Sequence, residues 1–166
     1  MSSHTYLVSP AAEKDIEDLV ALRSYILEGD SNGSYVSHDV EDSIQWRIAY
    51  RKWLNQVLET DDNIRVLIAK NDGVAVGCAT GIIDRRAPAR DCIFGFSGWV
   101  QSVVVAPPWR RHGIARQLML NLFDWFTSKR VSKIVLEATH EAESFYESLE
   151  FIRSPENLFF REDIKS

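Results

Sequence analysis

The sequence lacks a long uninterrupted apolar run, since its hydrophobic stretches fall far short of the ~20 residues that a membrane-spanning helix needs. Its N-terminal stretch, MSSHTYLVSP, also lacks the basic start and apolar centre of a secretory signal. These two absences argue against a membrane protein and against secretion. We therefore expect a cytoplasmic protein with no membrane partner.

Cysteine is scarce as well, with only Cys78 and Cys92 in 166 residues. Two cysteines cannot form the disulfide framework that holds many small secreted domains together. Reduced thiols fit the expected cytoplasmic location. Cys78 lies in a strand-like apolar run, so we expect a small core residue there rather than a nucleophile. We expect no bound metal.

A basic excess is also missing, because the net charge is −5. A protein that binds nucleic acid generally carries a basic face, so this charge argues against a nucleic-acid partner. Against this acidic background one local cluster of cationic residues is unusual, namely Arg110, Arg111, His112 and Arg116. A local positive patch on an acidic protein suits a small anionic ligand better than a long polyanion.

Tandem repeats and Pro- or Ser-rich linkers are absent, and the length suits a single domain over residues 1–166. The pattern predicts a helix with Pro10 at its first position and Ser9 as its cap. A second helix is expected over 41–58, with an apolar stripe that should face the core: Trp46, Ala49, Tyr50, Trp53, Leu54, Val57 and Leu58. Between two β-rich runs, Asn71-Asp72-Gly73 predicts a hairpin turn.

The order of the predicted elements indicates the fold class. We expect strands over 5–10, 98–107 and 132–139, helices over 111–127 and 140–150, and closing strands over 151–154 and 157–161. Strands and helices alternate only in the second half of the chain. That order predicts an α/β fold with a mixed sheet rather than a fully parallel one.

The stretch VVVAPPWRRHGIARQLML, residues 103–120, joins an apolar strand to an amphipathic helix. The first main-chain N–H groups of a helix have no partner within it, and with the helix dipole they favour an anion. Gly113 has no Cβ, so an oxyanion such as a pyrophosphate could approach the backbone closely there. The stretch is neither a G-x-G-x-x-G fingerprint nor a Walker A loop. Taken alone, it is also consistent with a plain helix start among solvated arginines.

Two blocks of sequence together resemble the GNAT superfamily of acyl-CoA-dependent N-acyltransferases. Residues 110–115, RRHGIA, fit the family's Arg/Gln-x-x-Gly-x-Gly/Ala pattern, and VQSVVVAPPW before them resembles its fourth strand. Downstream, VLEATHEAESFYESLEF resembles its fifth strand and following helix. The resemblance is specific from about Gly98 to Phe151. One departure is Glu150, which stands where the family usually has a glycine in a left-handed helix cap.

The resemblance implies a mostly antiparallel sheet, splayed between its fourth and fifth strands and flanked by about four helices. Acetyl-CoA would bind in the splay as the acyl donor. Main-chain N–H groups around Gly113 would hold its pyrophosphate, and the preceding strand would pair with the pantetheine amides. The cofactor-binding residues implied in this way are Val103, Val104, Val105, Arg110, Arg111, His112, Gly113, Ile114, Ala115 and Arg116.

The resemblance also implies a reaction, the direct transfer of an acetyl group to a primary amine through a tetrahedral intermediate. The N–H of Val105 is a candidate for stabilising the oxyanion. Tyr146 matches the family tyrosine that protonates the departing thiolate, and a phenol with a pKa of about 10 carries its proton at neutral pH. Ordinary aromatic packing of Tyr146 beside Phe145 remains the alternative.

The base that takes a proton from the amine is not identified by the sequence. The predicted fourth strand offers Gln101 and Ser102 but no carboxylate. Glu137 lies on the next strand, but its facing is open because a slip of one residue reverses every side chain. More distant candidates are Asp84, Asp39 and Glu41. We expect a water relay, with His112 facing the phosphate or solvent.

The acceptor is expected to be a small-molecule or peptide amine, with conflicting signs of its charge. Acidic residues between the first two helices would attract a cationic amine: Asp30, Asp39, Glu41 and Asp42. Arginines before the fourth strand would instead suit a carboxylate-bearing substrate: Arg85, Arg86 and Arg90. Tyr35 and Trp46 are candidates for an apolar wall. The sequence does not indicate which acyl chain is preferred. It also does not indicate whether the protein forms a homodimer, as many family members do.

Two other functions are consistent with parts of the sequence. A non-catalytic acyl-CoA sensor would use the same fold and ligand, although an intact Tyr146 disfavours it. A basic nucleic-acid module would bind oligonucleotides with a steep salt dependence, and the acidic net charge disfavours that function.

Overall fold

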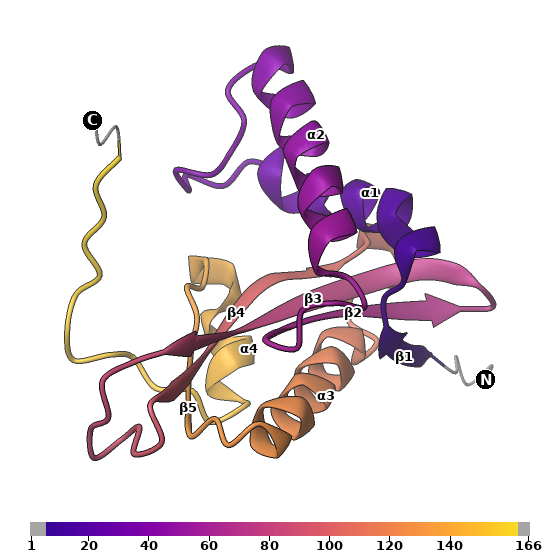
Figure 1. The fold of residues 1–166 in the computed structure, drawn as a ribbon. Helices are drawn as coiled ribbons and strands as arrows, with labels where there is room; N and C mark the ends of the chain where they lie inside the picture. The colour runs from indigo at the N-terminus through magenta and orange to yellow at the C-terminus, as the bar shows by residue number, and fades with distance from the viewer. Residues whose placement is uncertain (1–5, 163–166) are drawn as a thin grey trace.

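A computed structural model of the chain describes residues 6–162, which build a five-stranded sheet with helices on both faces (Figure 1). The strands lie in chain order: β1 (Leu7–Pro10), β2 (Ile64–Asn71), β3 (Val74–Arg85), β4 (Phe96–Val105) and β5 (Lys133–Val135). Neighbours pair antiparallel up to β4, whereas β5 runs parallel to β4. The predicted mixed, mostly antiparallel α/β sheet is confirmed.

Each face of the sheet is covered by two helices (Figure 1). On one face, α1 (Ile16–Leu27) and α2 (Val40–Val57) bury Leu19 and Leu54 against Ile68. On the other, α3 (Ile114–Ser128) buries Leu118 and Phe126, and α4 (Glu143–Glu147) packs beside it. Short 3-10 turns span Glu13–Asp15, Pro107–Trp109 and His140–Ala142. Among residues 6–162, no helix combines the length and apolar character of a membrane crossing.

The β2–β3 hairpin turns where the sequence predicts it. Asn71 pairs with Val74, and the two residues between them have left-handed backbones, with φ 47° at Asp72 and φ 82° at Gly73. Two consecutive positive φ angles are those of a type I′ turn, whose twist matches the flanking strands. The Asp-Gly pair is therefore the local cause of the hairpin.

The start of the first helix was predicted wrongly. Pro10 is the last residue of β1, where it pairs with Leu67, and the helix α1 begins only at Ile16. The strand pairing extends further, since the Ala11 N–H donates to the Val66 carbonyl at 2.8 Å. The buried Asp15 then accepts from the Ala12 N–H at 2.9 Å and organises the turn into the helix. Long-range sheet pairing thus overrides the local cap signal of Ser9 and Pro10.

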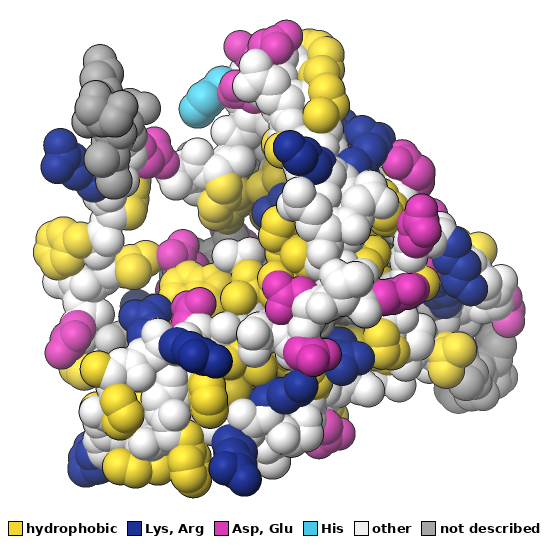
Figure 2. Space-filling model, in the orientation of Figure 1, with side chains coloured by type: hydrophobic (Ala, Val, Ile, Leu, Met, Phe, Trp, Pro, Cys, Tyr) yellow, Lys and Arg dark blue, Asp and Glu magenta, His cyan; other side chains and the backbone are white. Residues whose placement is uncertain are grey.

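The two closing strands were also predicted wrongly. Residues 152–162 form an extended arm that leaves α4 and carries its apolar side chains in solvent, at the left of Figures 1 and 2. Ile152 is 89% exposed, Phe159 88% and Phe160 74%. The neighbouring edge strand β5 has only three residues, so it presents few main-chain groups for a further strand. The apolar residues of the arm therefore form no strand or helix among the described residues.

Candidate functional site

The turn between β4 and α3 has an unusual backbone. Arg111 and Gly113 both have left-handed conformations, with φ 65° and 78°, and Gly113 is the N-cap of α3. The helix therefore begins at Ile114 and not at Arg111, which corrects the predicted start. The N–H groups of the first turn have no acceptor within the helix. A Cβ added at Gly113 would meet no atom within 4 Å, so the space beside this backbone is open.

The cationic side chains of this turn point in different directions. The Arg110 Nε donates to the Val105 carbonyl at 3.2 Å, which folds this side chain back on the end of β4. The His112 Nδ1 lies 2.7 Å from the Arg110 carbonyl oxygen, so the imidazole closes the turn. Arg111 and Arg116 are exposed. The turn therefore combines main-chain donors with exposed positive charge from Arg111 and Arg116.

One edge of β4 is open along its second half. β5 pairs with β4 only at Ser97, Gly98 and Trp99, so the strand beyond has a neighbour on one side only. A β-bulge interrupts the pairing with β3, because Cys78 lies opposite Val104 whereas Thr80 lies opposite Gln101. Ser102, inside the bulge, has a left-handed φ of 53°. A bulge bends a strand and re-aims its groups, so β4 and β5 diverge here.

The main-chain groups of Val103 and Val105 face the open edge. The Ala106 N–H donates to the Val76 carbonyl of β3 at 2.9 Å. Successive residues of a strand direct their main-chain groups to opposite sides, so those of Val105 point away from β3. Val103 shares that orientation, whereas Val104 pairs with Cys78 and faces β3. Of the three predicted valines, two therefore offer main-chain groups to a ligand in the splay.

A cavity of about 350 Å³ lies between the diverging strands. Its lining brings together residues that are far apart in sequence: Arg23, Tyr35, Gln101, Ser102, Val103, Glu137 and Tyr146. We call this cavity the splay cleft. Tyr35, Glu137 and Tyr146 were all candidates from the sequence. Glu137 lines this cleft, but it lies beyond the end of β5 at Val135 and not on the strand, as was predicted. The open edge of β4 joins the splay cleft to the turn at Gly113.

Tyr146 is held in the cleft by aromatic neighbours. Its ring centroid lies 5.0 Å from that of Phe145 and 5.8 Å from that of Phe151, the latter edge-on. Burial raises the pKa of the Tyr146 phenol to about 12, because the phenolate would lose its hydration. The hydroxyl therefore stays protonated at neutral pH and can donate a hydrogen bond.

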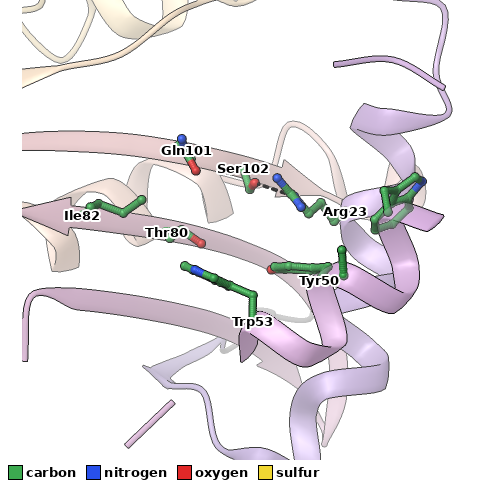
Figure 3. Close-up of a pocket in the computed structure, with 9 residues that line it drawn as sticks. Arg23, Tyr50, Trp53, Thr80, Ile82, Gln101 and Ser102 are labelled. Atoms are coloured by element: carbon green, nitrogen blue, oxygen red, sulfur yellow. Dashed lines mark hydrogen bonds between the residues drawn. The ribbon is translucent and has the colours of Figure 1, made fainter. Parts of the chain in front are cut away.

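A second cavity, of about 340 Å³, adjoins the splay cleft on the side of α2 (Figure 3). Three aromatic residues of α2 line it, Trp46, Tyr50 and Trp53, together with residues of β3 and β4. Figure 3 shows Tyr50 and Trp53 beside Thr80 and Ile82 of β3. Arg23, Gln101 and Ser102 line both cavities. We call this second cavity the aromatic cavity.

The aromatic cavity changes the interpretation of the α2 stripe. Tyr50, Leu54 and Val57 are buried as predicted, but Ala49 is exposed and Trp46 and Trp53 are only partly buried. The stripe is therefore part core and part cavity wall. Arg23 was not singled out by sequence reasoning. The sequence signal that could have indicated it is its position, because Arg23 is a single arginine next to the apolar residues of the first helix.

Most charged candidates for acceptor binding lie elsewhere. Asp39 caps α2 by accepting from the Asp42 N–H at 2.9 Å, and Glu41 accepts from Gln45 at 2.9 Å. Asp84 lies 3.5 Å from Arg86 in an exposed ion pair. None of the following residues lines the splay cleft or the aromatic cavity: Asp30, Asp39, Glu41, Asp42, Asp84, Arg85, Arg86 and Arg90.

Cys78 is not a nucleophile in this site. The residue is buried in the core shared by α1 and α2, and burial raises the pKa of its thiol to about 12. Only a thiolate attacks efficiently, and at neutral pH this thiol stays protonated. The predicted role as a small core residue agrees with this environment.

Comparison with known proteins gives concordant matches. A family model described as "Acetyltransferase (GNAT) family" matches residues 24–151. The uncharacterized N-acetyltransferase ycf52 of Porphyra purpurea is 27% identical over 144 residues, which cover 85% of this chain and 78% of that protein. An aminoglycoside N(6')-acetyltransferase type 1 of Salmonella typhimurium is 26% identical over 103 residues, or 60% of this chain and 70% of that protein. The crystal structure of a predicted acetyltransferase with acetyl-CoA from Clostridium acetobutylicum superposes with a TM-score of 0.77 at 19% identity, covering 95% of this chain and 96% of that one.

Proposed function

Because the chain belongs to the GNAT acetyltransferase family, we propose that it transfers an acetyl group from acetyl-CoA to a primary amine of a small molecule or peptide. The observation that carries the proposal is the open edge of β4, which runs from the cleft with Tyr146 to the left-handed turn at Gly113. The catalytic unit is taken to be one domain over residues 1–166. Its two free thiols, Cys78 and Cys92, suit a cytoplasmic location.

The turn at Gly113 is the proposed site for the diphosphate of acetyl-CoA. Main-chain N–H groups at a helix start and the helix dipole both favour an anion. The open space beside Gly113 admits phosphate oxygens close to the backbone. The exposed Arg111 and Arg116 add positive charge around it. The residues proposed to contribute main-chain donors are Arg111, His112, Gly113, Ile114, Ala115 and Arg116, with Arg110 holding the turn.

The pantetheine arm would lie along the open edge of β4 as an extra strand. An edge strand has unpaired N–H and C=O groups that bind an extended amide chain. Val103 and Val105 present such groups, although the Val105 carbonyl already accepts from Arg110. Val104 supports this edge from behind, since its side chain is buried against the α1–α2 face. This placement carries the thioester toward Tyr146.

In the proposed reaction a neutral amine attacks the thioester carbonyl carbon. A C–N bond forms, the C–S bond breaks, and the electron pair of the broken bond leaves on sulfur. Val105, the candidate oxyanion donor from the sequence, does not line the splay cleft, whereas Val103 does. We therefore assign to the Val103 N–H the role of donating to the oxygen that becomes negative. The Tyr146 hydroxyl donates to the departing sulfur. Both groups act on charge that develops during the reaction.

The amine must also lose a proton. Glu137 is the one carboxylate among the residues that line the splay cleft or the aromatic cavity. It is exposed, so water reaches it. We assign it the role of accepting the proton through a water molecule. The amine of a small molecule is supported as acceptor by the Salmonella relative, whose name describes acetyl transfer to an aminoglycoside.

The test combines acetyl-CoA binding by calorimetry with thiol release across a panel of amines. The proposal predicts binding and amine-dependent release of CoA. Binding without release on any amine would favour the sensor function. A well-folded protein that does not bind acetyl-CoA would overturn both functions.

A further inference from the structure

Arg23 lies at the boundary between the splay cleft and the aromatic cavity. It projects from α1 toward β4, where its Nε donates to the Ser102 Oγ at 3.1 Å (Figure 3). Its guanidinium carbon lies 4.4 Å from the ring centroid of Tyr50. The residue lines both cavities. A ligand that enters either one therefore meets its charge.

No acidic side chain among residues 6–162 lies within ion-pair distance of Arg23. Two other arginines of the same helix pair do have partners, since Arg47 binds Glu28 at 2.9 Å and Arg51 binds Glu17 at 2.7 Å. Desolvation lowers the pKa of the Arg23 guanidinium, although an arginine keeps its charge. A half-buried cation without a counter-charge is unfavourable, and a bound anion would compensate it.

The surroundings of Arg23 indicate what kind of anion fits. Trp46, Tyr50 and Trp53 line the aromatic cavity, and this apolar lining suits an apolar or aromatic body. The neutral polar residues in its lining are Thr80, Gln101 and Ser102. A planar guanidinium matches a carboxylate with two parallel N–H donors, and the Nη atoms are the ones not used by Ser102.

We propose that the acceptor is an amine that also bears a carboxylate and an apolar or aromatic body, such as an amino acid or short peptide. Arg23 binds the carboxylate, the aromatic cavity holds the body, and the amine faces Glu137 and Tyr146 in the splay cleft. This inference rests on the proposed acetyl transfer and narrows its substrate class. Arg23 is a specificity-determining residue in this arrangement.

The same features disfavour a polycationic acceptor. An aminoglycoside carries several ammonium groups, which would meet Arg23 and find a single carboxylate, Glu137, in the lining of the two cavities. Like charges in a partly desolvated site repel. The acceptor named for the Salmonella relative is therefore not expected for this chain.

The experiment compares acceptors with and without the carboxylate, with kcat/KM calculated for the neutral amine because amidation lowers the pKa of the neighbouring amine. We would measure kcat/KM for phenylalanine, tryptophan and glycyl-phenylalanine against their C-terminal amides, in the wild type, Arg23→Gln and Arg23→Lys. Arg51→Gln, which removes an arginine from the same helix pair, is the control. The wild type and the control should prefer an acid over its amide by about 10- to 100-fold, the range of a charge-assisted hydrogen bond. Arg23→Gln should lose that preference through KM, and Arg23→Lys should restore part of it.

Three outcomes would overturn the inference. The first is equal use of acids and amides by the wild type. The second is turnover of phosphate-bearing or polycationic amines in place of carboxylates. The third is an Arg23→Gln protein with a much lower melting temperature and no activity on any acceptor. That result would show that Arg23 supports the fold rather than binding the acceptor.

A separate measurement distinguishes this inference from the proposed function. If no amine is acetylated, calorimetry with N-acetyl-phenylalanine still reports carboxylate binding. Binding that is at least about tenfold weaker in Arg23→Gln than in Arg51→Gln would support the Arg23 site even then. Equal binding to both variants would contradict it.

Discussion

Replacement of Tyr146 by phenylalanine removes one hydroxyl and keeps the aromatic packing. The ring contacts with Phe145 and Phe151 are those of the ring itself, so the fold should persist. The variant therefore isolates the contribution of the phenol to the departure of the thiolate. We expect a lower kcat and little change in the KM for acetyl-CoA.

The magnitude follows from the pKa of the phenol, which burial raises to about 12. An alkyl thiol such as cysteine has a pKa of about 8.5, so complete proton transfer to the thiolate would be uphill by roughly 5 kcal/mol. Tyr146 should therefore act as a hydrogen-bond donor to the developing charge. Such a bond contributes about 1.5–3 kcal/mol, which corresponds to a loss of about 10- to 150-fold in kcat.

The assay is steady-state thiol release with the best amine, measured from pH 6 to about 10, where a phenol with this pKa stays almost fully protonated. The wild-type kcat should show no fall at the alkaline end of that range. Tyr25→Phe, which changes an exposed tyrosine of α1, is the control. Unchanged kcat in Tyr146→Phe would remove the residue from the mechanism. An alkaline limb below pH 10 that vanishes in the variant would contradict the high pKa.

Three further predictions concern stability. Glu150 has a left-handed backbone with φ 68°, which is strained for a residue with a side chain. Glu150→Gly should therefore raise the unfolding free energy by about 1 kcal/mol and Tm by about 2–4 °C. A lower Tm would show that the backbone at this position is not strained. Phe159 and Phe160 are exposed, so replacing both by serine should change the unfolding free energy by less than about 0.5 kcal/mol. A loss of several kcal/mol, which is what removing buried aromatic side chains costs, would show that the arm packs against the rest of the protein. Burial raises the pKa of Asp15, but hydrogen bonds from Lys70 and the Ala12 N–H outweigh it and hold the pKa below its ordinary 3.8. Its stabilising contribution is therefore complete above pH 3.8 and lost as the pH falls below that value. Urea unfolding should show a larger loss of stability in acid for the wild type than for Lys70→Met, since the lowered pKa values of Glu17, Glu28 and Asp91 are common to both proteins.

The parts of the site that local sequence encodes were predictable. The strand and the helix on either side of Gly113 were predicted from contiguous residues, although the helix begins at Ile114 and not at Arg111, and the left-handed turn between them was not predicted. The same holds for the Asp72-Gly73 turn and for the positive φ at Glu150, which the departure from the family pattern indicated. In each case, a few neighbouring residues determine the backbone.

The parts that depend on long-range packing were not predictable. Arg23 reaches Ser102 across 79 residues of sequence, and no local pattern links them. Glu137 lies beyond β5 because that strand ends at Val135, and a periodic pattern fixes such an end only to within a residue or two. The prediction of the closing strands failed for a similar reason, because an apolar run around Phe159 does not reveal whether a strand edge is available to pair with it.

The most direct test of the account is calorimetric titration of acetyl-CoA into the wild type, Gly113→Glu and Gly73→Glu. Both glycines have positive φ, at 78° and 82°, and open space for a side chain, so the two variants carry equal strain and charge. Only Gly113 lies at the start of α3, where the main-chain donors are proposed to hold the diphosphate. The account predicts binding by the wild type and Gly73→Glu, and an affinity at least about tenfold lower in Gly113→Glu. Equal affinity in all three proteins would contradict it.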